Sequence, residues 1–289
     1  MNSLELIDQL EEKAIQIRKD ICYTTAQIGY SHIGGSMSMT DIAVALYYKF
    51  LRFDPKNPHW EDRDRLVLSK AHCAMCLYNI FVDLGMYPKE ELHSGYNQID
   101  SRFGMHPSRK LIPGIEASLG SLGHGLSIAV GMAMAGRIDQ KNHRIFCITG
   151  DGELNEGSNW EAIMSAGHYQ LGNLVNIVDY NHRQVQGTTK EIMDLDPLDD
   201  KFRSFNWEVM VINGNDMSQV VEALAALPPS DSTTRRKPLC IIAHTVKGKG
   251  IKAAEEGNGW HVGTIGNHNL EECIASIESM RRKKVNNHE

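Results

Sequence analysis

The chain has 289 residues, of which 42% are hydrophobic and 23% are charged, and its formal net charge is −6. This length suits one large α/β domain or two smaller ones, and the composition is typical of a globular protein. The negative charge argues against general nucleic-acid binding, and no apolar run approaches the ~20 residues that span a bilayer.

The cysteines follow no disulfide or zinc pattern. Six are present, and Cys73 and Cys76 form a C-x-x-C motif without the second pair that a zinc site needs. His72 precedes this motif, whereas haem attachment needs a histidine after it. We therefore expect packing thiols. Residues 4–21 form an amphipathic helix pattern instead of a signal peptide, so we expect a cytoplasmic protein.

The first half of the chain combines helical patterns with glycine-rich loops. Apolar spacing predicts a helix over residues 3–23, a glycine-rich loop over 29–36 and a helix over 40–50. A short strand over 65–68 then leads into a helix over 71–84, and residues 87–118 are predicted to be irregular. A loop over 120–125, here called the glycine loop, opens a helix over 126–138 that is rich in small residues.

The second half alternates strands with helices. Apolar runs predict strands that end near Gly150, over 174–178, over 208–212 and over 239–244. Helices are predicted between them over 158–170, 197–205 and 217–227, with loops over 187–195 and 228–238 and a last helix over 270–282. This alternation predicts an α/β fold with a mostly parallel sheet and helices on both faces. We expect a single domain over residues 1–289.

The segment Gly150-Asp151-Gly152 and the later Asn181 stand where two of these strands end. The 28 residues between Gly152 and Asn181 match one strand–helix–strand unit, so Asp151 and Asn181 would lie side by side at one sheet edge. A main-chain carbonyl near Arg183 would add a third oxygen donor. Mg²⁺ is commonly held by a few protein oxygens together with substrate phosphates, and glycines let a diphosphate approach the backbone. The pattern predicts a joint site for a metal and a phosphate.

Other motifs have a second interpretation. The glycine loop is no dinucleotide fingerprint, because Ile128 stands where the third glycine belongs, but a helix that opens after it suits an anion. The pair Lys247 and Lys249 could attract an anion or lie on a solvated loop. Glu156 could simply favour the first turn of a helix. Histidines in loops or at helix starts could move protons or have structural roles; they are His32, His72, His106, His124 and His261.

Gly150-Asp151-Gly152 followed by Asn181 resembles the thiamine diphosphate motif, and the surrounding segments resemble the transketolase family over nearly the whole chain. The matching segments are Ser31-His32-Ile33-Gly34-Gly35, Ser69-Lys70-Ala71-His72, Met105-His106-Pro107, Gly120-Ser121-Leu122-Gly123-His124-Gly125, Thr245-Val246-Lys247-Gly248-Lys249-Gly250 and Trp260-His261.

The resemblance implies a role for each matched residue. It implies a thiamine diphosphate-binding fold with Mg²⁺ or Ca²⁺ held by Asp151, Asn181 and the carbonyl of Arg183. Contacts to the cofactor would come from His72, Gly120, Ser121, Leu122, Gly152, Asn181 and His261. His32, His106 and His261 would face the sugar substrate. Glu156 matches an acidic residue at the cofactor site that links two active sites across a dimer.

The chain departs from the family pattern at several positions. The family commonly has Gly-His-Gly where this chain has Ala71-His72-Cys73, and Pro and Gln where Ser121 and His124 stand. These changes, with Lys70, leave the substrate preference open. Full transketolases also continue into a pyrimidine-binding domain whose glutamate activates the aminopyrimidine ring. The resemblance therefore implies the N-terminal subunit of a split transketolase, which transfers a two-carbon ketol unit between sugar phosphates once a C-terminal subunit joins it, as an α2β2 heterotetramer.

Three other functions fit parts of the pattern. An α-type subunit of a 2-oxo acid dehydrogenase shares the diphosphate motif, but the several histidine loops argue against it. A relative of deoxyxylulose-phosphate synthase is a further alternative, although that family normally forms one long chain. A non-catalytic regulatory subunit could retain the cofactor half-site, but the intact set of histidines argues against loss of activity.

Overall fold

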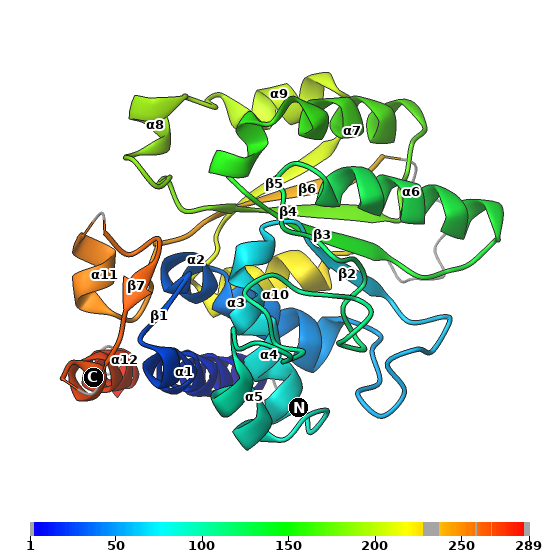
Figure 1. Ribbon diagram of the computed structural model, residues 1–289. Coiled ribbons are helices and arrows are strands. Elements are labelled where there is room, and N and C mark those ends of the chain that lie inside the picture. Colours follow the sequence, from blue (N-terminus) through cyan, green and yellow to red (C-terminus); the bar gives the residue numbers. More distant parts are fainter. Residues whose placement is uncertain (1–2, 228–236, 258, 267, 286–289) are drawn as a thin grey trace.

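The computed structural model describes residues 3–227, 237–257, 259–266 and 268–285. Its central sheet has five strands, each parallel to its neighbours (Figure 1). In spatial order they are β2 (Arg65–Leu68), β3 (Ile145–Gly150), β4 (Leu174–Tyr180), β6 (Leu239–His244) and β5 (Glu208–Asn213). The predicted α/β class with a parallel sheet is confirmed.

Two groups of helices cover the two faces of the sheet (Figure 1). One group contains α6 (Gly125–Ile138), α7 (Gly157–His168) and α9 (Leu198–Ser204). The other contains α1 (Ser3–Ile28), α3 (Thr40–Ala45), α4 (Ala74–Asp83) and α10 (Met217–Ala225). A hydrophobic core lies between the sheet and each group of helices, and alternate residues of β3 point into the two cores. Cys147 packs with the first group, and Phe146 and Ile148 pack with the second. Every residue of β3 and β4 is buried, which explains their continuous apolar runs.

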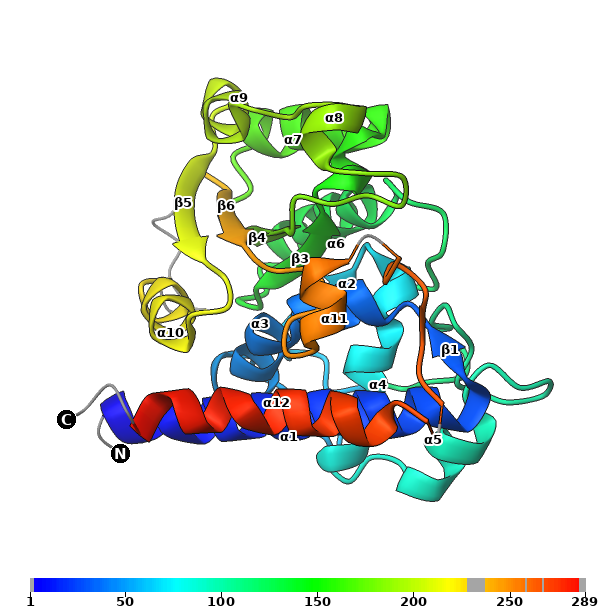
Figure 2. The same cartoon turned by 90° about the vertical axis from the view of Figure 1, so that its left-hand side faces the viewer.

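The chain ends on the side of the molecule where it begins. Helix α12 (Leu270–Val285) lies alongside α1 (Figure 2), and Lys19 pairs with Glu278 at 2.6 Å. Strand β1 (Tyr30–Ser31) pairs antiparallel with β7 (Gly263–Thr264). The remaining short helices are α2 (Ile33–Ser38), a π-helical turn η1 (Leu46–Phe50), 3₁₀ turns η2 (Ala71–Cys73) and η3 (Gly152–Asn155), α5 (Lys89–Gly95), α8 (Thr189–Ile192) and α11 (Lys252–Glu256).

The first helix is longer than predicted. It ends at Ile28 instead of residue 23. The hydroxyls of Thr24 and Thr25 donate to carbonyl oxygens one turn earlier, at 2.9 and 2.8 Å, so these residues continue the helix. Gly29, with φ of 83°, follows its last turn, because a glycine adopts this left-handed conformation at little cost.

The segment predicted as a glycine-rich loop contains a helix, α2, so the prediction of a pure loop over 29–36 was wrong. Its glycines nevertheless permit close packing, as the composition suggested. A Cβ on Gly34 would lie 2.3 Å from the carbonyl oxygen of Trp260, and one on Gly35 would lie 2.6 Å from Cys73 Sγ. Tertiary contacts therefore decide the conformation here.

Other boundaries also differ. Helix α5 lies inside the segment predicted to be irregular, and α8 lies inside the loop predicted over 187–195, where Thr188 and Glu191 form a capping box. The helix predicted from residue 71 begins with the 3₁₀ turn η2. Of the loop predicted over 228–238, residues 228–236 lie outside the described residues.

All six cysteines are buried free thiols, in agreement with the packing role expected for Cys73 and Cys76. None of the helices in the described ranges combines the length and apolar character that a membrane span requires.

Candidate active site

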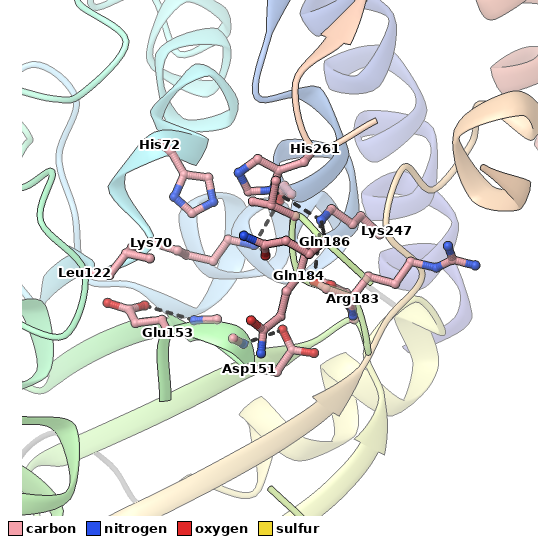
Figure 3. Close-up of a pocket in the computed structure, with 15 residues that line it drawn as sticks. Lys70, His72, Leu122, Asp151, Glu153, Arg183, Gln184, Gln186, Lys247 and His261 are labelled. Carbon is pink, nitrogen blue, oxygen red and sulfur yellow. Dashed lines mark hydrogen bonds between the residues drawn. The ribbon is translucent and has the colours of Figure 1, made fainter. Parts of the chain in front are cut away.

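A cavity opens at the carboxyl ends of the parallel strands, where such sheets bind ligands. Because Gly150 of β3 lies beside Asp179 of β4, the residues that follow these two strands, including Asp151 and Asn181, come together at this edge. The residues that line the cavity (Figure 3) are Gly35, Lys70, His72, Leu122, Gly150, Asp151, Gly152, Glu153, Asn181, Arg183, Gln184, Val185, Gln186, Lys247 and His261. Seven of them were singled out from the sequence as metal or cofactor residues: His72, Leu122, Asp151, Gly152, Asn181, Arg183 and His261.

Four histidines from segments far apart in the sequence form one cluster beside the cavity. The ring of His32 lies 5.2 Å from those of His72 and His261 and 6.3 Å from that of His106, measured between centroids. Burial, followed by the charge of Lys70, lowers the pKa of His72 to about 2. Burial and then Lys247 lower the pKa of His261 to about 4. These imidazoles are therefore neutral at pH 7 and can both donate and accept hydrogen bonds.

The three expected metal donors stand at the base of the cavity. Asp151 is 2% exposed, and its two oxygens accept hydrogen bonds from the Gly152 amide at 2.8 Å and the Thr189 hydroxyl at 3.0 Å. Asn181 Oδ1 accepts from the Arg183 amide at 3.2 Å. Burial, and then repulsion by Asp179, raise the pKa of Asp151 to about 6.

This donor set suits a hard cation. A carboxylate, an amide oxygen and a main-chain carbonyl are the oxygen ligands that Mg²⁺ and Ca²⁺ prefer. Throughout the described ranges, no three His, Cys, Asp or Glu side chains gather as a metal cluster. One carboxylate is sufficient for Mg²⁺ when phosphate oxygens and water complete its octahedron. The residues present therefore fit a metal that binds together with a diphosphate.

A buried ion pair that the sequence did not reveal supports this edge of the sheet. Lys70 and Asp179 are 2% and 0% exposed and form a salt bridge. Asp179 also accepts hydrogen bonds from the hydroxyls of Ser38, at 2.6 Å, and Thr245. Burial would lower the pKa of Lys70, but the attraction of Asp179 outweighs it and raises that pKa. Asp179 directly follows the predicted apolar run of residues 174–178 and was not singled out, because only its position between the ends of β3 and β6 shows its role.

Lys247 lies inside the cavity and not on a solvated loop. It is 6% exposed, and its Nζ lies 3.0 Å from the Gln184 carbonyl oxygen and 3.2 Å from His261 Nδ1. Burial and then the charge of Lys70 lower its pKa to about 8. Lys249, the other lysine of the motif, pairs instead with Glu255 at 3.6 Å. Of the two lysines, Lys247 is therefore placed to meet an anion in the cavity.

Three residues predicted at the cofactor site do not line this cavity. A Cβ on Gly120 would lie 3.5 Å from the ring of His106, so Gly120 lies beneath that histidine. Ser121 lines a separate surface hollow with His124 and Ile128. Glu156 is exposed at the N-cap of α7, where its side chain makes no capping hydrogen bond.

The cavity at the carboxyl edge of the parallel sheet thus contains oxygen donors and cationic groups that suit a metal-bound diphosphate. Residues 11–280 match the family described as "Transketolase, thiamine diphosphate binding domain", and the chain belongs to this family.

Two related proteins match almost end to end, and both are named as single subunits of a transketolase. The chain is similar to one subunit of the apulose-4-phosphate transketolase of Phocaeicola vulgatus, with 35% identity over 97% of this chain and 99% of that protein. It is also similar to SqwG, a subunit of the 6-deoxy-6-sulfo-D-fructose transketolase of a Clostridium species, with 38% identity over 90% of each.

Solved transketolases share the fold but are longer. The transketolase from Campylobacter jejuni superposes with a TM-score of 0.84 at 31% identity, over 97% of this chain and 43% of that one. The transketolase from Leishmania mexicana gives the same TM-score at 28% identity, over 94% of this chain and 41% of that one. The chain thus spans less than half the length of these solved transketolases.

Proposed function

We propose that the chain is the N-terminal subunit of a two-chain transketolase, which binds thiamine diphosphate with Mg²⁺ or Ca²⁺ and transfers a two-carbon ketol unit between sugar phosphates. In this proposal residues 1–289 form one cofactor-binding domain. The observation that carries it is the buried pair Asp151 and Asn181 at the base of a cavity that also contains Lys247 and two neutral histidines. A diphosphate with its metal is the ligand class that complements this combination.

Each residue has a role in this proposal. Asp151, Asn181 and the Arg183 carbonyl hold the metal, and Gly152 leaves room for the diphosphate at the backbone. His72 and Lys247 donate hydrogen bonds to the diphosphate, and Leu122 contacts the rings. When bound, thiamine diphosphate supplies the acidic ring carbon that carries the two-carbon fragment. His32, His106 and His261 orient the sugar hydroxyls and move protons between them.

A second chain is part of the proposal because one chemical group is missing from the cavity. Bound thiamine diphosphate would need a carboxyl group beside its aminopyrimidine ring to become reactive. Among the described residues, the cavity contains the carboxylates of Asp151 and Glu153. The first is assigned to the metal, and the second accepts three hydrogen bonds from the protein. We therefore assign the activating carboxylate to a C-terminal subunit with a pyrimidine-binding domain.

The surface of α6 supports this assembly. Ile128 and Ile138 are 36% and 78% exposed, and Gly131 and Ala135 lie between them on the exposed side of the helix. Such an apolar stripe with small residues suits close packing against another subunit. We propose an α2β2 heterotetramer that acts in the cytoplasm, where the six free thiols stay reduced.

The names of the related proteins indicate the substrate class. One is named for apulose 4-phosphate and another for 6-deoxy-6-sulfo-D-fructose, both of which are sugars with an anionic group. We propose a ketose donor and an aldose acceptor of this class, each with a phosphate or an equivalent anion.

The test combines the purified chain with a candidate C-terminal subunit, thiamine diphosphate, Mg²⁺, a ketose phosphate and an aldose phosphate. Ketol transfer should need both chains, and Asp151→Ala in this chain should abolish it. Activity of this chain alone would refute the split-subunit proposal. Decarboxylation of a 2-oxo acid by the assembled pair, without ketol transfer, would favour the dehydrogenase alternative. Tight cofactor binding by the chain alone, with no activity in any pair, would favour a regulatory subunit.

A further inference from the structure

A buried glutamate, Glu153, joins three segments of the chain at the cavity. It is 3% exposed and lies in the turn η3 that follows β3. Its Oε1 accepts hydrogen bonds from the Ser69 hydroxyl and from the Gly123 amide at 2.9 Å, and its Oε2 accepts from the Gly150 amide at 3.0 Å. One carboxylate thus connects the end of β2, the end of β3 and the glycine loop. Burial raises its pKa, and these three donors oppose that rise.

Ser69 makes a second link to the glycine loop. Its Oγ donates to Glu153 and accepts a hydrogen bond from the Gly125 amide at 3.1 Å. The backbone of the loop lies directly on this pair. A Cβ on Gly125 would lie 2.4 Å from Ser69 Oγ, and Gly123 has a φ of 86° that side chains rarely adopt. Only glycine fits these two positions while both hydrogen bonds are kept.

The three connected segments differ in how firmly they are held elsewhere. Gly150 is part of β3, whose neighbours β2 and β4 bond it on both sides. In the part of the chain that the structure describes, the glycine loop makes hydrogen bonds to other segments through the side chains of Glu153, Ser69 and Ser158. The Ser158 hydroxyl donates to the Gly123 carbonyl oxygen at 2.8 Å. Removal of the Glu153 carboxylate should therefore release the loop much more than the strand.

We propose that Glu153 is a positioning residue that fixes the glycine loop, and with it Leu122, at the ring end of the cofactor site. This inference rests on the proposed function, since it takes Leu122 as a contact of the thiamine rings. Leu122 is the side chain of the loop that lines the cavity. A loop displaced from Glu153 would change the packing of the rings, while the metal donors that follow β3 and β4 would stay in place.

The experiment separates the two ends of the cofactor with two probes. The full chain is titrated by calorimetry, in the presence of Mg²⁺, with thiamine diphosphate and separately with inorganic pyrophosphate, which has no ring. We expect Glu153→Ala to weaken binding of thiamine diphosphate about tenfold and of pyrophosphate less than about twofold, because the lost hydrogen bonds act on the loop. Ser69→Ala should also weaken binding of thiamine diphosphate more than binding of pyrophosphate, but by a smaller factor. This variant replaces Glu153→Ala in the experiment if Glu153→Ala does not fold. Glu161→Ala on the exposed side of α7 is the matched control and should change neither affinity.

Hydrogen exchange in the ligand-free chain provides a measurement that does not depend on the cofactor. The amides of the glycine loop should exchange on the order of tenfold faster in Glu153→Ala, while those of β3 stay protected. The positioning role would be overturned if Glu153→Ala weakened the binding of both probes equally or of neither. Unchanged hydrogen exchange in the glycine loop of this variant would overturn it as well. If neither the unaltered chain nor its assembly with a C-terminal subunit binds either probe, the proposed function fails, and the exchange measurement still decides whether Glu153 holds the loop.

Discussion

Two buried aspartates stand at opposite ends of the central sheet and have different surroundings. Asp64 precedes β2 at the amino ends of the strands, and its carboxylate accepts hydrogen bonds from the guanidinium groups of Arg144, at 2.7 Å, and Arg52, at 3.4 Å. Asp151 follows β3 at the carboxyl ends. Its hydrogen-bond donors are neutral, namely the Gly152 amide and the Thr189 hydroxyl.

The difference shows how to distinguish a structural charge from a functional one. At the amino ends the protein supplies the cations itself, and the network joins the segments that enter β2 and β3. At the carboxyl ends, burial and Asp179 raise the pKa of Asp151 to about 6, a sign that its charge is poorly compensated. A buried carboxylate in this state is suited to a cation from outside the protein. Burial alone would not have separated the two sites.

Asp64→Ala should have the largest effect, and it should be on stability. The substitution removes the buried carboxylate that pairs with the half-buried guanidinium of Arg144, so we expect the free energy of unfolding to fall by about 3 kcal/mol. Denaturant unfolding measures this loss. Under conditions where the variant is still folded, its affinity for Mg²⁺ and thiamine diphosphate should equal that of the unaltered chain. A loss of affinity in the folded variant would contradict the assignment of a purely structural role to Asp64.

Asp151→Asn should produce the opposite pattern. Loss of this proposed metal ligand should weaken Mg²⁺-dependent binding of thiamine diphosphate by more than about 100-fold, beyond the range known for residues that only support a ligand. At pH 7 the raised pKa means that ionised Asp151 disfavours the folded state, so a neutral Asn should leave the free energy of unfolding unchanged or higher. Calorimetry and thermal unfolding of the same sample measure both effects. A large loss of stability would show that Asp151, like Asp64, has a structural role.

Thr189 supports Asp151 at the carboxyl ends of the strands. Its hydroxyl orients Asp151 from the helix α8, and the side chain is 2% exposed. Thr189→Val keeps the shape and removes the donor, so we expect about tenfold weaker Mg²⁺-dependent cofactor binding. Thr189→Ser retains the hydroxyl and is the matched control. Equal affinities for the two variants would show that the hydroxyl does not orient the carboxylate.

His143 should have the smallest effect, at the amino end. Burial and then the charge of Arg65 lower its pKa from 6.5 to about 4. Between these values the unfolded chain binds more protons, so stability that is present above pH 6.5 is lost as the pH falls towards 4. We expect a loss of about 1 kcal/mol at pH 5 relative to pH 7, and its absence in His143→Gln. Parallel denaturant titrations at the two pH values measure the difference, and identical pH dependence in both proteins would contradict it.

The sequence by itself determined the parallel sheet and the edge at which Asp151 and Asn181, the proposed metal donors, lie. The apolar runs of β3, β4 and β6 are continuous because helices cover both faces, so their ends could be located. The spacing from Gly152 to Asn181 then placed both donors at one edge. Chain order is enough for this inference, since parallel neighbours end at the same edge of a sheet.

Only the tertiary structure decided which buried groups belong to each other. Lys70 and Asp179 are 109 positions apart, and Ser69 and Glu153 are 84 apart, so no local pattern predicts either contact. The helix α2 was missed for the same reason, because its glycines are packed by Trp260 and Cys73 from distant segments. Local propensity and periodicity describe one segment at a time. The free energy of a buried charge depends on neighbours that only the folded chain brings into contact.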